Sequence, residues 1–303
     1  MALLPTGLAI AGLALILVGT VVIVRLRAFP KAYGLGVLSM AVFALQLADP
    51  FVTLQLGLRS EAFLSGATWW APLTYMFVHA DPFHLVGNLF ILLTAGAALE
   101  DRLGERTFFV VYFAAGFAAA LGHLGMAEIL PRIVSPFSLA VGASGAIFGV
   151  LTTYAVLFPR KNLPILLGIM VFWFPSFGVL LIYLGFNVAY MFAQTGIAWW
   201  GHFSGFLVGL AAAFAFQNRL RAPTTPLATD AALAALATTP ETKEILAKIE
   251  TFTGTAADDA TFRDAWVEKL VRKARCPSGH ALAREKSTVR CAGGEFELDL
   301  AKG

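Results

Sequence analysis

The chain has 303 residues, of which 58% are hydrophobic and 14% are charged, and its formal net charge is +3. Soluble domains contain roughly 45–50% apolar and about 25% charged residues, so this composition excludes a single soluble domain, and the small, dispersed charge predicts no nucleic-acid partner. Residues 1–217 carry only 16 of the 41 charged side chains, which predicts a membrane domain followed by a water-soluble C-terminal region.

Seven apolar stretches in residues 1–217 are candidate membrane helices. They run approximately Thr6–Val24, Ala32–Ala48, His84–Leu99, Thr107–Gly125, Gly142–Phe158, Phe174–Ala193 and Trp199–Phe216. A spanning helix needs about 20 residues, with roughly 17 as the lower limit, so several of these are short. Their Gly, His, Asn and Ser residues predict a bundle with a polar, partly wet interior. We therefore expect an all-α polytopic membrane protein.

The basic residues between these stretches predict the orientation. One face carries nine of them: Arg25, Arg27, Lys31, Arg102, Arg106, Arg160, Lys161, Arg219 and Arg221; the other carries only Arg59 and Arg132. Because Lys and Arg favour the cytoplasmic side, we expect a cell-membrane protein with its N-terminus outside and its tail in the cytoplasm. The first stretch lacks the charge order of a secretory signal, so we expect it to be a retained anchor.

Three longer segments connect these stretches, and one of them, Met126–Val141, is expected outside and contains two prolines. Asp49–Phe83 is expected outside and carries Trp69 and Trp70. Lys161–Trp173 is apolar but too short to cross the membrane and return, so we expect it to lie against the bundle at the inner surface. The sequence contains no internal repeat, which disfavours a transporter.

Polar residues inside a membrane are costly and are by default functional candidates. Three clusters are predicted near the external side: His84 with Asn88, Gly142 to Gly145 around Ser144, and Gly201 to Gly205 around His202. Asn187, Tyr183 and Tyr190 form a fourth cluster in the sixth stretch. A serine hydroxyl becomes a nucleophile when an adjacent histidine accepts its proton, so Ser144 and His202 are a candidate pair.

The surrounding residues suit the same chemistry. Ser144 at a helix start has free backbone N–H groups nearby, and His84 and Asn88 could add donors for a developing oxyanion. Small residues four apart on two helices, Gly145 and Gly149 with Gly205 and Gly209, allow close packing. Each of these patterns also has a purely structural interpretation. The serine and glycine patterns could reflect only helix packing, and a histidine at a helix end could be an interfacial residue. Without further comparison the residues predict a polytopic membrane protein with a candidate Ser–His site.

At these residues the sequence resembles the rhomboid family of intramembrane serine proteases. The segment Gly142–Gly149 fits the family pattern GxSGxxxG, Gly201–Gly209 fits xHxxGxxxG, and His84–Asn88 fits HxxxN. The segments Leu73–Ala80 and Leu99–Gly104 are also similar to the family. The resemblance covers roughly residues 32–220 and implies a six-helix core.

The resemblance implies a role for each site residue. Ser144 would be the nucleophile and His202 the general base, without a third acidic residue; His84, Asn88 and the Ser144 N–H would form the oxyanion hole. Gly142, Gly145 and Phe148 would support the site, with Phe148 packed against the base. No cofactor and no metal are expected. Where the family usually has Trp-Arg in its external loop, this chain has Trp70-Ala71.

Three regions are therefore expected: an extra N-terminal transmembrane anchor (1–31), a rhomboid-like six-helix protease core (32–220), and a linker with a cytoplasmic C-terminal region (221–303). The expected activity is cleavage of transmembrane segments of single-pass or other membrane proteins within the lipid bilayer. One alternative is a catalytically silent rhomboid-like protein that binds membrane clients. A transporter or channel is a further alternative, disfavoured by the missing repeat.

The C-terminal region opens with an Ala/Thr/Pro linker, Ala222–Thr239, followed by two predicted amphipathic helices, Glu241–Glu250 and Asp258–Arg275. Cys276, His280 and Cys291 follow. A structural zinc site normally needs four ligands, and only three candidates are visible, so we expect two reduced cysteines in a small hairpin, with zinc binding as the alternative.

Overall fold

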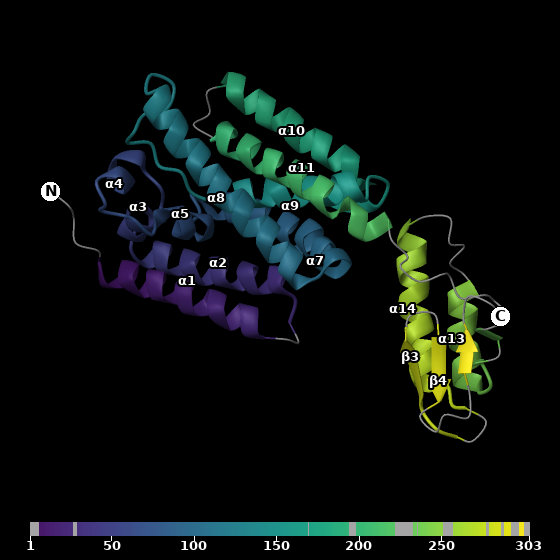
Figure 1. The fold of residues 1–303 in the computed structure, drawn as a ribbon. Helices are drawn as coiled ribbons and strands as arrows, with labels where there is room; N and C mark the ends of the chain where they lie inside the picture. Colours follow the sequence, from purple (N-terminus) through teal and green to yellow (C-terminus); the bar gives the residue numbers. More distant parts are fainter. Residues whose placement is uncertain are drawn as a thin grey trace. The chain divides into compact units, whose positions relative to one another are not determined.

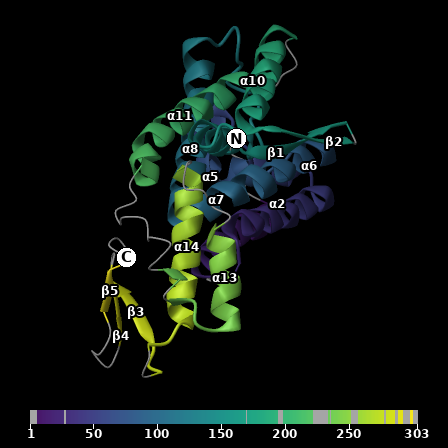
Figure 2. The same cartoon turned by 90° about the vertical axis from the view of Figure 1, so that its right-hand side faces the viewer.

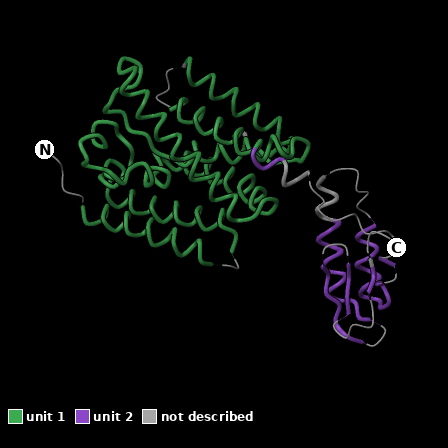
Figure 3. Tube along the Cα trace, in the orientation of Figure 1, with its two compact units in different colours: residues 1–214 green, residues 215–303 purple. Residues whose placement is uncertain are grey.

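The structure is a computed structural model. It describes residues 6–26, 29–168, 170–193, 198–221, 233–234, 236–250, 257–276, 279–285, 288–291 and 297–299. The chain divides into two compact units, Met1–Phe214 (unit 1) and Ala215–Gly303 (unit 2), which are coloured separately in Figure 3. Most of the expected linker Ala222–Thr239 lies outside the described residues.

Unit 1 is a helical bundle (Figure 1). Five helical segments are long and apolar enough to cross a membrane: Gly7–Arg25, Lys31–Ala48, Pro82–Leu103, Glu105–Ile129 and Trp199–Gln217. Two shorter apolar helices are Ser144–Leu157 and Ser176–Phe192. They correspond in order to the seven apolar stretches predicted from the sequence, which confirms an all-α multi-pass membrane architecture.

The helix bounds differ from the predicted stretches by a few residues. They are α1 (Gly7–Arg25), α2 (Lys31–Ala48), α6 (Pro82–Ile91), the π-helical turn η2 (Leu92–Gly96), α7 (Ala97–Leu103), α8 (Glu105–Ile129), α9 (Ser144–Leu157), α10 (Ser176–Ala193) and α11 (Trp199–Arg221). The third membrane segment starts at Pro82 because the Asp81 carboxylate accepts a hydrogen bond from the His84 N–H at 2.9 Å and caps the helix. It then continues through η2 and α7 to Leu103.

The segment between α2 and α6 folds into short helices: α3 (Phe51–Leu56), α4 (Ser60–Leu64), α5 (Ala71–Thr74) and the turn η1 (Tyr75–Phe77). Two side chains hold it together, since Trp70 Nε1 donates to the Gln55 carbonyl at 2.9 Å and Thr74 Oγ1 donates to the Leu56 carbonyl at 2.6 Å. Ala71, which stands at the family's arginine position, is completely buried. The loop is thus anchored by local hydrogen bonds, and its fold leaves no exposed place for an arginine at residue 71.

The segment expected to lie against the bundle forms an antiparallel β-hairpin. Strand β1 (Asn162–Leu167) pairs with β2 (Met170–Pro175), and Gly168 turns the chain with a φ of +63°. Leu163 and Ile165 of β1 are buried, whereas every residue of β2 is exposed. Figure 2 shows the hairpin beside α6, which β1 contacts.

Helix α9 is the central element of the bundle, and every residue from Gly145 to Ala155 is buried. Its glycines bring neighbouring backbones into contact. A Cβ added at Gly145 would overlap Ala119 of α8, and one added at Gly205 of α11 would overlap the Gly145 carbonyl oxygen. Glycine at these positions therefore lets α9 lie against both α8 and α11 at the level of the candidate site.

Glu100 of α7 ties this segment to the start of α2. Its two carboxylate oxygens accept hydrogen bonds from the N–H groups of Lys31 and Ala32 at 2.7 and 2.9 Å. A carboxylate at a helix N-terminus satisfies free N–H groups and complements the helix dipole. The buried Lys31 ammonium forms an ion pair with Glu105 at 3.1 Å.

Unit 2 contains the two predicted amphipathic helices, α13 (Pro240–Glu250) and α14 (Ala257–Lys273). They are followed by an antiparallel sheet of β3 (Leu282–Glu285), β4 (Thr288–Cys291) and β5 (Glu297–Asp299), in that order. Leu270, Val271, Ile249 and Val289 are among the residues of its buried apolar core. The third strand extends the small hairpin that was expected from the sequence.

Candidate active site

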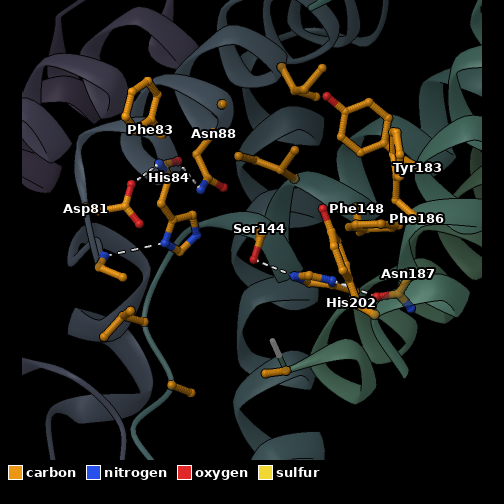
Figure 4. Close-up of a pocket in the computed structure, with 18 of the residues that line it drawn as sticks. Asp81, Phe83, His84, Asn88, Ser144, Phe148, Tyr183, Phe186, Asn187 and His202 are labelled. Carbon is orange, nitrogen blue, oxygen red and sulfur yellow. Dashed lines mark hydrogen bonds between the residues drawn. The ribbon is translucent and has the colours of Figure 1, made fainter. Parts of the chain in front are cut away.

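Ser144 and His202 lie in direct contact although 58 residues separate them. Ser144 is the first residue of α9, and His202 lies in the first turn of α11. The close glycine contacts between these helices bring Ser144 Oγ to 2.7 Å from His202 Nε2. Figure 4 shows the two side chains pointing toward each other.

Asn187 of α10 orients the imidazole. Its Nδ2 donates to the Trp199 carbonyl at 3.1 Å, so its Oδ1 faces His202 Nδ1, 2.8 Å away. An amide oxygen only accepts hydrogen bonds, so Nδ1 of a neutral imidazole must carry the hydrogen here. His202 Nε2 is then the unprotonated nitrogen, which accepts the hydrogen bond from the Ser144 hydroxyl.

Sequence reasoning noted Asn187 as polar but gave it no role. No third acidic residue was expected from the motif, and the Asn187 amide oxygen supplies the acceptor for His202 Nδ1. The signal in the sequence was an asparagine in an apolar helix, since such a group is costly in a membrane without a partner.

Phe148 covers one face of the imidazole. Its ring stacks on that of His202 with centroids 4.8 Å apart and planes 11° apart. Tyr183 of α10 packs edge-on against Phe148, at a centroid distance of 6.2 Å. These contacts restrict rotation of the imidazole.

His84 and Asn88 lie on the other side of Ser144 (Figure 4). They are one turn apart on α6, and Asn88 Nδ2 donates to the His84 carbonyl at 2.8 Å, which leaves its second amide hydrogen for another acceptor. Gly142 lies close to His84, and a Cβ added at Gly142 would be only 2.6 Å from His84 Nε2. The φ angle of Gly142 is +108°. Glycine is thus required at residue 142 for both space and backbone conformation.

His79 and Gln46 support this side of the site. The Gln46 amide accepts from the His79 N–H at 3.0 Å and donates to the His79 carbonyl at 2.8 Å, which fixes the chain just before α6. The His79 ring packs edge-on against that of His84 at 5.3 Å. Burial, and secondarily the nearby His84, lower the pKa of His79 to about 3, so this ring is neutral at physiological pH.

A cleft of about 630 Å³ contains all four of these polar side chains, Ser144, His202, His84 and Asn88. Its remaining lining is mostly apolar and aromatic, including Phe83, Phe148, Tyr183 and Phe186. Phe83 is 89% exposed, so an aromatic side chain stands at the open edge. The arrangement can pass a proton from the Ser144 hydroxyl to the His202 imidazole beside a cleft lined mainly by apolar and aromatic side chains.

Residues 66–219, about half of the chain, match the family model of the rhomboid domain. The chain is 31% identical over 161 residues to rhomboid protease GluP of Bacillus subtilis (52% of this chain, 28% of that protein). It is 39% identical over 82 residues to rhomboid-like protease 3 of Toxoplasma gondii (27% and 28%) and 30% identical over 139 residues to putative rhomboid protease YdcA of Bacillus subtilis (44% and 66%). The matches thus cover less than two thirds of the length of each of these relatives. Because this family model matches about half of the chain, the chain belongs to the rhomboid family.

Proposed function

We propose that this rhomboid-family protein is an intramembrane serine endopeptidase that cleaves transmembrane segments of other membrane proteins. The observation that carries the proposal is the 2.7 Å contact between Ser144 Oγ and His202 Nε2 at the edge of a cleft inside an apolar bundle. Ser144 is the nucleophile and His202 the general base.

The reaction follows from this geometry. Ser144 Oγ attacks the scissile carbonyl carbon while its proton moves to His202 Nε2, and a tetrahedral oxyanion forms. The C–N bond then breaks, His202 protonates the leaving amine, and the substrate remains as an ester on Ser144. A water molecule, deprotonated by His202, hydrolyses the ester and restores the serine hydroxyl.

The oxyanion is stabilised by groups around the start of α9. Ser144 begins the helix, so its N–H has no acceptor within the helix and the positive end of the helix dipole points toward it. Asn88 and His84 supply side-chain donors from the other side. Gly142 and Gly145 are supporting residues, because they permit the close approach of His84 and of the neighbouring helices.

Asn187 is a positioning residue in this mechanism. By accepting the hydrogen bond from His202 Nδ1 it keeps Nε2 free to receive the serine proton, and it stabilises the imidazolium that forms transiently.

The substrates are single-pass or other membrane proteins embedded in the lipid bilayer. A helical substrate must unwind locally, because its carbonyls are engaged in its own hydrogen bonds, so small and helix-breaking residues are preferred. We propose that the N-terminus lies outside and the tail in the cytoplasm of a cell membrane, with α1 as an anchor preceding the six-helix core, and that the reaction uses no cofactor.

The test uses a serine-reactive fluorophosphonate probe and a reporter transmembrane substrate with the full chain in detergent. Ser144→Ala should abolish both labelling and cleavage, and His202→Ala should abolish cleavage with labelling near background. Ser39→Ala is the matched control, because Ser39 is also a buried helical serine but its hydroxyl bonds the Leu35 carbonyl in α2. Wild-type cleavage by folded Ser144→Ala protein would refute the proposal.

A further inference from the structure

The second cluster of chemically reactive side chains lies in unit 2. Cys276, His280 and Cys291 place one ligand atom each within 4.8 Å of one another. The His280 Nδ1 is nearly equidistant from the two sulfurs, 3.9 Å from Cys276 Sγ and 3.7 Å from Cys291 Sγ. Both cysteines are unbridged and buried, and His280 lies at the surface beside them.

The local fold explains this convergence. Cys276 follows the end of α14, where its carbonyl accepts from the Gly279 N–H at 2.8 Å and its N–H donates to the His280 carbonyl at 3.1 Å. The positive φ of Gly279 closes this turn and returns the chain to β3. Cys291 pairs with Leu282 at the start of β3, so the register of the hairpin brings the end of β4 back to the same turn.

We propose that Cys276, His280 and Cys291 bind a zinc ion that holds the end of α14 to the β3–β4 hairpin. Two thiolates and one imidazole nitrogen form a donor set that suits Zn²⁺. In tetrahedral coordination with the usual bond lengths, sulfur and nitrogen ligands are about 3.6 Å apart. The two Sγ–Nδ1 distances are within a few tenths of an ångström of this value.

The sulfurs must move apart by about 1.1 Å to admit the ion. They lie 2.7 Å apart, whereas two zinc-bound thiolates are about 3.8 Å apart. On binding, each thiol releases its proton to solvent, and the two thiolates cancel the charge of the ion. A neutral complex is compatible with the apolar residues around both cysteines. Water or an added donor can take the fourth position, which these three ligands leave open.

Zinc binding would affect the stability of unit 2. The core of unit 2 contains only twelve buried side chains among the described residues, and small domains often add a metal or disulfides for stability. The ion would join three parts of unit 2: Cys276 just after α14, the turn at His280, and Cys291 at the end of β4. Zinc binding would therefore stabilise unit 2 and require no participation of the Ser144 site.

The experiment measures metal in the full chain, purified in detergent under reducing conditions without chelators. Elemental analysis should find about one zinc per chain, and Ser144→Ala should keep it. Cys291→Ser should lose it. Because losing even an outer-sphere partner of a metal ligand typically weakens binding about 10–100-fold, His280→Ala should weaken zinc binding at least that much. His280 is exposed, so this variant should fold.

Two further measurements do not depend on the variants. The chain has only two cysteines, so titration of the wild type with a mercurial reagent should release one zinc per two thiols. Replacement of zinc by Co²⁺ should give the absorption of tetrahedral cobalt bound to thiolate. No zinc uptake by the reduced wild type, another metal in its place, or unchanged zinc affinity in His280→Ala would overturn the proposal.

Discussion

The two units bury different kinds of side chain. Of the sixteen buried polar or charged side chains among the described residues, fifteen belong to unit 1 and only Thr242 belongs to unit 2. Unit 1 also exposes many large apolar side chains, such as Leu121 and Ile129. In a membrane, lipid is as apolar as a protein core, so helices associate through close backbone packing and polar contacts. In water, burial of apolar surface provides the main driving force.

This difference predicts opposite sensitivities. In unit 1, removal of a buried polar group at the cleft should mainly alter catalysis, because the backbone contacts at the glycines remain. In unit 2, removal of a buried methyl group should mainly alter stability. Substitutions at four positions follow, from the largest expected effect to the smallest.

Asn88→Ala should give the largest loss. If the Asn88 amide donates to the oxyanion, kcat should fall by about 10²–10³, as for other isolated donors of this kind, with little change in KM. Labelling of Ser144 by the fluorophosphonate should remain largely intact, since the contact with His202 is untouched. Turnover and thermal unfolding are measured on the same sample. A lower melting temperature with normal kcat would instead make Asn88 a packing residue.

Leu270→Ala should act only on unit 2. Leu270 is completely buried in its apolar core, and truncation of a buried leucine typically costs about 2–5 kcal/mol. Limited proteolysis of the full chain should therefore show faster cleavage within unit 2, while turnover of a reporter substrate stays at the wild-type level. A parallel loss of protease activity would show that the two units depend on each other.

Asn187→Ala should lower kcat by about 10–100-fold, less than the 10²–10⁴ attributed to general acid–base catalysis as a whole, because Phe148 still restrains the imidazole. Unlike Asn88→Ala, it should also slow fluorophosphonate labelling, since the tautomer of His202 is no longer enforced. Asn187→Asp keeps an oxygen acceptor for Nδ1 and should restore part of the labelling rate. Equal labelling rates in Asn187→Ala and wild type would exclude the positioning role.

His79 should produce a small pH dependence of stability. Its folded pKa of about 3 lies below the unfolded value of about 6.5, so the unfolded state binds more protons and stability falls as pH drops through 6.5 toward 3. Between pH 7 and pH 6 this group alone should cost about 0.7 kcal/mol. His79→Gln lacks this titrating group. Acidification should therefore lower the melting temperature of the wild type more than that of the variant. A difference that stays constant from pH 7 to pH 5 would contradict the assignment.

The features that could be predicted from the sequence were those marked by a continuous apolar run or by a short motif. Long apolar runs marked the seven membrane stretches, and the motifs around Ser144, His202, His84 and Asn88 marked the cleft. The β1–β2 hairpin was missed because its residues are almost uniformly apolar and lack the alternation that identifies a half-buried strand. Only the turn glycine, Gly168, hinted at it.

The contacts that depend on helix rotation could not be read from sequence. Asn187 reaches His202 because α10 turns that face toward α11, and Glu100 caps α2 because η2 and α7 continue the segment past Leu99. Neither the rotation of a uniformly apolar helix nor a π-helical turn has a clear periodic signature. The contacts of Asn187 and Glu100 can therefore be identified only from the three-dimensional arrangement of the helices.

The length of α9 sets the depth of its serine. Its 14 residues rise about 21 Å, whereas the hydrocarbon core of a bilayer is about 30 Å thick. If the Leu157 end lies level with one face of the hydrocarbon layer, Ser144 lies about 9 Å inside the other. The proposed hydrolysis at that depth needs water, which would have to reach Ser144 through the cleft that this residue lines.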